Sequence, residues 1–132
     1  WAGVAAMKKA YGIYKQKGYR LRLLSAATRN HMHWSEFIGG EVVVTLTHEW
    51  QKRFIASDIE VKHRMDTPVA PQIIDGLYSK FEDFRRSYDE NGMTVDEFDA
   101  YGPNVRTLRG FIDGYHSLVA TIRDMMLPNP DI

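Results

Sequence analysis

Apolar residues recur every three or four residues in some segments and follow one another without interruption in others, and this difference separates predicted helices from predicted strands. Steps of three and four residues predict a helix over 2–17, which Gly18 ends, and a longer helix over 105–126. A similar apolar stripe predicts a helix over 72–89, and short helical pieces are expected over 34–38 and 48–56. The pattern therefore predicts at least three substantial helices.

Two other segments are typical of β-strands. Residues 20–27 run from basic and apolar side chains into small ones, and residues 41–46 are β-branched and apolar without alternation. An apolar run without alternation is typical of a strand that is buried on both faces of a parallel sheet. With the short helical piece between them, the two segments predict a right-handed βαβ unit with parallel strands.

Two such strands do not make a stable parallel sheet, because each needs partners at its edges. The chain is therefore interpreted as an incomplete α/β sheet followed by a mostly helical C-terminal tail. It also begins inside an apolar helical pattern, at Trp1 and not at Met. We expect it to be a piece of a longer protein and, because its edges lack partners, to form homo-oligomers.

Composition narrows the possible partners. Seventeen basic side chains balance seventeen acidic ones, so no general attraction to nucleic acid is expected. The sequence has no cysteine, no signal peptide and no apolar run of about 18 residues, which predicts a cytoplasmic protein without a membrane partner. One run is locally basic, and we interpret it as a solvated helix face and the start of a strand: Lys8, Lys9, Lys15, Lys17, Arg20 and Arg22.

The candidate chemistry lies where the first predicted strand ends. Small residues there leave room for a ligand, and Arg29 follows them with a guanidinium that can bind phosphate oxygens in pairs. Thr28, Asn30 and the N–H groups of the next helix start could add polar contacts. The alternative is that Arg29 pairs with a nearby carboxylate and has a structural role.

These residues resemble a motif of the transaldolase family. In that family a strand of small residues ends in Ser-x-Arg-Asn, and a helix and a Gly-led, β-branched strand follow. The segments that match are Leu24–Asn30, Phe37–Gly40 and Val42–Leu46. The resemblance implies a partial TIM barrel, with its last two parallel strands and their helices in residues 1–56. It assigns residues 57–132 to a helical C-terminal extension that packs on the barrel.

The same resemblance implies a function and site residues. The family transfers a three-carbon ketol unit between sugar phosphates, as in the pentose phosphate pathway, without a cofactor. Its phosphate-binding arginine corresponds to Arg29, with Thr28 and Asn30 as neighbouring contacts. The family's serine, two positions before that arginine, is replaced by Ala27 here.

The catalytic group of the family is a Schiff-base lysine on an earlier strand, and neither predicted strand here contains a lysine. We therefore expect no catalytic residue in this chain and no transfer activity from it alone. The pair His31 and His33 lacks the further ligands of a zinc site, so no metal is expected. Two alternatives stay open: a sugar-phosphate aldolase fragment, and a helical interaction module that uses 72–89 and 105–126.

Overall fold

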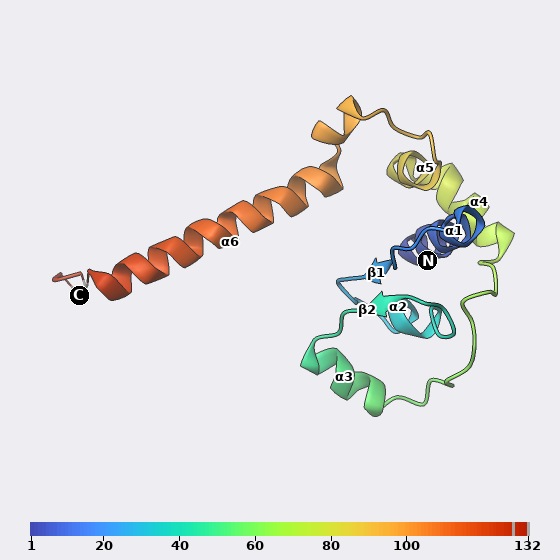
Figure 1. Ribbon diagram of the computed structural model, residues 1–132, viewed down its shortest axis with the longest axis horizontal. Coiled ribbons are helices and arrows are strands. Elements are labelled where there is room, and N and C mark those ends of the chain that lie inside the picture. The colour runs from blue at the N-terminus through green and yellow to red at the C-terminus, as the bar shows by residue number, and fades with distance from the viewer. Residues whose placement is uncertain (128, 132) are drawn as a thin grey trace. The chain divides into compact units, whose positions relative to one another are not determined.

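The computed structural model describes residues 1–127 and 129–131, and most of them are helical (Figure 1). Two compact units are present, Trp1–Gly92 and Met93–Ile132. The elements of the first unit are α1 (Ala2–Lys17), β1 (Leu24–Ser25), α2 (Met32–Ser35), β2 (Val43–Val44), α3 (His48–Ile55), α4 (Pro71–Lys80) and α5 (Glu82–Tyr88). Those of the second are the 3-10 helix η1 (Asp96–Asp99) and α6 (Gly102–Met126).

The predicted fold class, an α/β partial TIM barrel, is wrong. Helices make up 57% of the structure, and the described residues contain two strands of two residues each. The strands are parallel, as predicted, with Leu24 opposite Val43 and Ser25 opposite Val44. Among the described residues, no further strand flanks either one. Leu24 and Val43 stay 55% and 43% exposed, whereas strands of a parallel sheet are buried on both faces.

The core of the first unit lies between α1 and the βαβ segment, not within a sheet. Val4 of α1 is fully buried and packs with Phe37 and Met65. Around these three, Met7, Tyr11, Met32, Val42 and Val69 are partly buried. The core therefore joins α1 to the residues after α2 and to the irregular segment before α4.

Helix α1 begins and ends where the sequence predicts. Gly18 adopts a left-handed conformation with φ of 64°, and its N–H and that of Tyr19 bond to the carbonyls of Lys15 and Tyr14. This pattern is a glycine C-cap. The ring of Trp34 in α2 packs on Phe54 of α3, with ring centroids 4.7 Å apart, and fixes α3 to the βαβ segment.

The single long helix predicted over 72–89 is instead two helices, α4 and α5. Phe81 has φ of −126° and ψ of 107°, an extended conformation that interrupts the helix. The break lets both pieces contact α1. Lys9 of α1 holds α5 by a hydrogen bond of 2.7 Å to the Tyr88 carbonyl and lies 4.1 Å from the centre of the Tyr88 ring.

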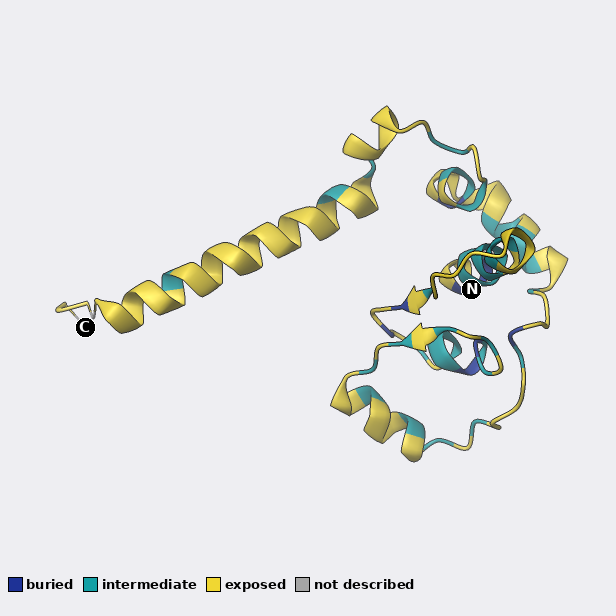
Figure 2. Cartoon of the chain, viewed as in Figure 1, coloured by how far each residue is buried: buried dark blue, intermediate teal, exposed yellow. Residues whose placement is uncertain are grey.

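The second unit consists of a capped turn and one long helix. The N–H of Thr94 donates to the Glu97 carboxylate at 2.8 Å, half of the capping box that their spacing predicts. Helix α6 covers the predicted 105–126, and almost all of its residues are exposed (Figure 2). Within the described part of the chain, no helix has the length and apolar character needed to cross a bilayer.

Candidate functional site

The turn between β1 and α2 holds the predicted site residues, and its backbone has an unusual conformation. Ala27 adopts a left-handed conformation with φ of 59°, which costs a residue with a Cβ roughly 1–2 kcal/mol. Such conformations persist where the surrounding structure holds them, and they gather at functional sites. Ala27 is also the residue at which the predicted resemblance implies a serine.

Thr28 is buried and anchors the turn to the segment after β2. Its hydroxyl donates to the Thr45 carbonyl at 3.3 Å. Asn30 anchors the turn at its other end, because its side-chain oxygen accepts the N–H of Met32 at 2.9 Å. Both predicted contact residues are therefore engaged within the protein, and the turn is held on both sides of Arg29.

The backbone N–H groups that follow are also used internally. Those of His33 and Trp34 bond to the carbonyls of Asn30 and His31, at 3.3 and 3.1 Å. Met32 already donates to the Asn30 side chain. The backbone donors that the sequence suggested for phosphate at this helix start are thus already occupied.

Arg29 differs from its neighbours because its side chain is exposed. Its backbone N–H donates to the Nδ1 atom of His33 at 3.3 Å, whereas its guanidinium has no hydrogen bond or ion pair with any described residue. The structural alternative for Arg29, pairing with a nearby carboxylate, is therefore not observed in the described part of the chain. A fixed backbone presents a cation with five unused donors.

His33 is the residue of this turn that sequence reasoning missed. Burial lowers the pKa of its imidazole below the usual 6.5, and the positive charges of the amino terminus and of Arg29 lower this pKa further. A hydrogen bond to the Ala27 backbone raises the pKa but does not cancel these effects. An uncharged imidazole can accept the Arg29 N–H. The sequence feature that could have indicated this contact is the spacing of four residues between Arg29 and His33 across a helix start.

A cavity of about 240 Å³ opens beside the turn. Its lining comes from α1, β1, the residues after β1 and the α2 region: Gly3, Met7, Leu24, Ser25, Ala26, His33 and Phe37. The buried Ser25 hydroxyl donates to the His33 carbonyl at 3.3 Å, so one wall is fixed to the strand. The cavity is small and mostly apolar, and it lies next to the residues that lead to Arg29.

The structure gives the two histidines of the His-x-His pair separate partners. His31 lies 3.3 Å from the Ser35 hydroxyl, and His33 lies 3.4 Å from the Asn30 amide. Among the described residues, no group of three or more histidine and carboxylate side chains could hold a metal ion.

Comparisons with family models, with curated proteins and with solved structures find no match to this chain. The assignment to the transaldolase family stays a prediction from the motif residues.

Proposed function

We propose that this chain contributes the phosphate-binding turn of a transaldolase-like transferase that acts on sugar phosphates. The observation that carries the proposal is Arg29, an exposed guanidinium without a protein partner among the described residues, on a turn anchored at both sides. Charge-assisted bonds from a guanidinium to phosphate are strong and directional. Because Thr28 and Asn30 already anchor the turn, phosphate binding would cost less conformational entropy.

The three predicted residues would have different roles. Arg29 would contact the phosphate, whereas Thr28 and Asn30 would position the turn through their own hydrogen bonds. His33 joins them as a positioning residue, because it accepts the N–H of Arg29. The transfer of a three-carbon ketol unit would depend on a lysine outside this chain, since β1 and β2 contain none.

The test is binding of a phosphorylated ketose by the whole chain. Titration with fructose 6-phosphate should shift the backbone amide signals of residues 26–33 in an NMR spectrum. Arg29→Ala should weaken this binding about 10- to 100-fold, because a charge-assisted pair contributes about 1.5–3 kcal/mol. Unphosphorylated fructose should bind equally weakly to both proteins.

Lys52→Ala provides a matched control, because Lys52 is an exposed cation on α3. It removes the same charge and should leave the affinity for fructose 6-phosphate unchanged. Equal losses for Arg29→Ala and Lys52→Ala would show only a general charge effect. Equal losses for fructose and its phosphate would show that Arg29 is structural.

A second candidate function, a helical interaction module, is favoured by one observation on α6. Apolar residues recur there at alternating steps of three and four over three heptads: Val105, Leu108, Ile112, Tyr115, Val119, Ile122 and Met126. Phe111, Leu118 and Met125 widen this stripe, and they are 76%, 59% and 77% exposed. A continuous apolar surface of this kind marks a protein interface.

The partner we propose for the α6 stripe is a parallel second copy of this chain. One edge of the stripe is basic, with Arg109, His116 and Arg123 at heptad spacing. In a parallel pair this edge lies beside Phe111, Leu118 and Met125 of the other copy, whose apolar side chains the arginine stems can cover. An antiparallel pair would set Arg109 against Arg123, which like-charge repulsion disfavours.

Self-association should therefore depend on the stripe. We expect the chain to sediment as a dimer at micromolar concentrations and Ile112→Glu to sediment as a monomer, because a carboxylate cannot be buried unpaired. Ser117→Glu adds the same charge on the opposite face of α6 and should leave the dimer intact. A monomeric wild-type chain, or a dimeric Ile112→Glu variant, would contradict this assignment.

A further inference from the structure

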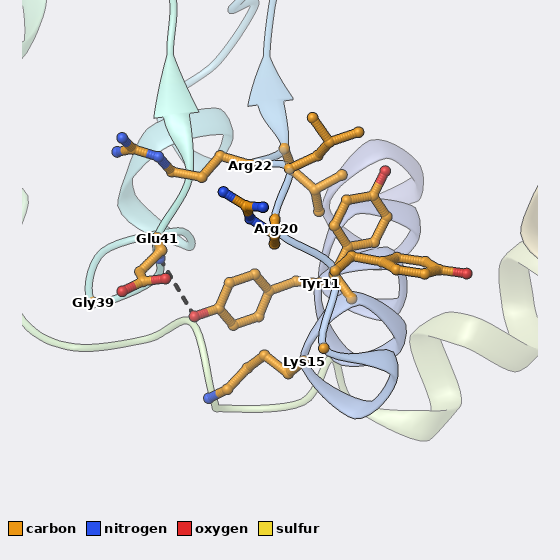
Figure 3. Close-up of a pocket in the computed structure, with 11 residues that line it drawn as sticks. Tyr11, Lys15, Arg20, Arg22, Gly39 and Glu41 are labelled. Carbon is orange, nitrogen blue, oxygen red and sulfur yellow. Dashed lines mark hydrogen bonds between the residues drawn. The ribbon is translucent and has the colours of Figure 1, made fainter.

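A second cavity lies at the other end of the two strands, on the side where they begin. Its volume is about 480 Å³, within the range of small-molecule sites (Figure 3). The C-terminal half of α1 forms one wall, and the segments that lead into β1 and β2 form the others. The lining residues are Tyr11, Tyr14, Lys15, Gly18, Tyr19, Arg20, Leu21, Arg22, Leu23, Gly39 and Glu41.

Two arginines dominate the charge of this cavity. Arg20 and Arg22 are two residues apart in the extended segment before β1, so their side chains lie on the same side of it. In Figure 3 both side chains project toward the segment that leads into β2. Both residues are exposed, and neither guanidinium has a hydrogen bond or ion pair with a described residue. Two unpaired guanidinium groups in one hollow form a receptor for an anion with several oxygen atoms.

The other charged groups of the cavity limit what that anion can be. Lys15 adds a third cation, but it also pairs with Asp66, because its Nζ atom lies 3.9 Å from the Asp66 Oδ1 atom. Glu41 adds one carboxylate, which repels a ligand that is anionic along its whole length. The arrangement therefore suits a ligand with an anionic end for the arginines and a neutral hydrogen-bond donor for Glu41.

Tyrosines form the remaining walls. The Tyr11 hydroxyl accepts the Glu41 N–H at 3.3 Å, so α1 holds Glu41 at the edge of the cavity, as Figure 3 shows. Tyr14 and Tyr19 pack edge to face, with ring centroids 5.1 Å apart. Aromatic walls give apolar contact area to a ligand, and hydroxyl groups supply polar ones.

We propose that this cavity binds a phosphate monoester of a polyhydroxy compound. The phosphate lies between Arg20 and Arg22, a ligand hydroxyl donates to Glu41, and the carbon skeleton lies against the tyrosine rings. The site is separate from Arg29, which follows β1, whereas these residues precede it. The inference therefore goes beyond the proposed function and does not depend on it.

The test uses the whole chain with ribose 5-phosphate, inorganic phosphate and ribose as probes, and reads each site by its own amide signals. Ribose 5-phosphate should shift the signals of residues 19–23 and of Glu41. The double variant Arg20→Ala/Arg22→Ala should weaken this binding at least about tenfold. A matched double variant of exposed cations elsewhere in the chain, Lys52→Ala/Arg106→Ala, should bind as the wild-type chain does.

A single substitution separates the hydroxyl contact from the phosphate contact. Glu41→Gln should weaken ribose 5-phosphate but not inorganic phosphate, because it replaces the charged acceptor of the sugar hydroxyl by a weaker neutral one and removes the negative charge that repels a free phosphate. Ribose alone should bind at least about tenfold more weakly than its phosphate. Circular dichroism and thermal unfolding of each variant establish that it is folded.

Unchanged binding in Arg20→Ala/Arg22→Ala would overturn the proposal, as would equal affinities for ribose and its phosphate. So would a loss of the signal shifts at residues 19–23 in Arg29→Ala, since that result would place the ligand at the other end of the strands. Failure of the proposed function has a different signature: residues 26–33 would not respond to fructose 6-phosphate while residues 19–23 still respond to ribose 5-phosphate.

Discussion

Lys8→Met should lower the free energy of unfolding of the first unit by about 3–5 kcal/mol, the range expected when one partner of a buried ion pair is removed. The Nζ atom of Lys8 lies 2.9 Å from the Glu36 carboxylate and donates to the Arg64 and Thr67 carbonyls at 2.9 and 2.7 Å. The Lys8 and Glu36 side chains are only 9% and 16% exposed. Methionine fills a similar volume but leaves the largely buried Glu36 carboxylate unpaired and removes the Lys8 donor from both carbonyls, of which that of Arg64 keeps the Thr67 N–H at 3.0 Å.

Urea unfolding followed by circular dichroism measures this loss. Lys17→Met is the control, because Lys17 lies 4.0 Å from Glu90 and is 51% exposed, and exposed pairs contribute about 0–1 kcal/mol. The double variant Lys8→Met/Glu36→Leu should recover part of the stability, since it also removes the buried charge. Equal effects of Lys8→Met and Lys17→Met would show that the Lys8 contacts do not stabilise the unit.

Gly39→Ala should cost about 2–4 kcal/mol, for two separate reasons. Gly39 has φ of 91°, a region that residues with a Cβ rarely adopt. A Cβ there would also lie 2.6 Å from the Cγ and Cε1 atoms of the His63 ring. To relieve this clash the His63 side chain would have to rotate and give up its hydrogen bond of 2.8 Å to Asp66.

Substitution of a second glycine should change the free energy of unfolding in the opposite direction. Gly12 lies within α1 and has open space where a Cβ would be, so Gly12→Ala should raise the free energy of unfolding by about 0.5–1 kcal/mol. In the double variant Gly39→Ala/His63→Ala, only the backbone strain should remain. If Gly39→Ala unfolds at the same urea concentration as the wild-type chain, the left-handed turn at Gly39 is not required.

The helices that the sequence predicts well are those whose pattern is local. Helix α1 with its glycine cap and helix α6 follow from spacing and end signals within a few residues. The break at Phe81 does not follow, because the stripe over 72–89 continues across it, and both pieces form their contacts with α1, far away in the sequence. The strands are shorter than predicted because their length depends on neighbouring strands, not on their own β-branched residues.

For the charged residues too, local sequence patterns predict less than contacts between residues far apart in the sequence require. Lys8 belongs to a basic run that we interpreted as a solvated helix face, and this interpretation is wrong for Lys8 because its partners are residues 28 to 59 positions away. Position after a strand was sufficient to select Arg29 as a candidate. The internal hydrogen bonds of Thr28 and Asn30, and the role of His33, depend on the actual path of the turn.

The contacts of α1 also have a consequence for synthesis on the ribosome. Lys9 bonds to the Tyr88 carbonyl, 79 residues later, and Lys8 to the Thr67 carbonyl, 59 residues later. At 5–20 residues per second, roughly 4–16 s pass between translation of Lys9 and of Tyr88. The apolar face of α1 that holds Val4 is itself incompletely covered until Phe37 and Met65 have been made, and until then it is a natural binding site for chaperones on the nascent chain.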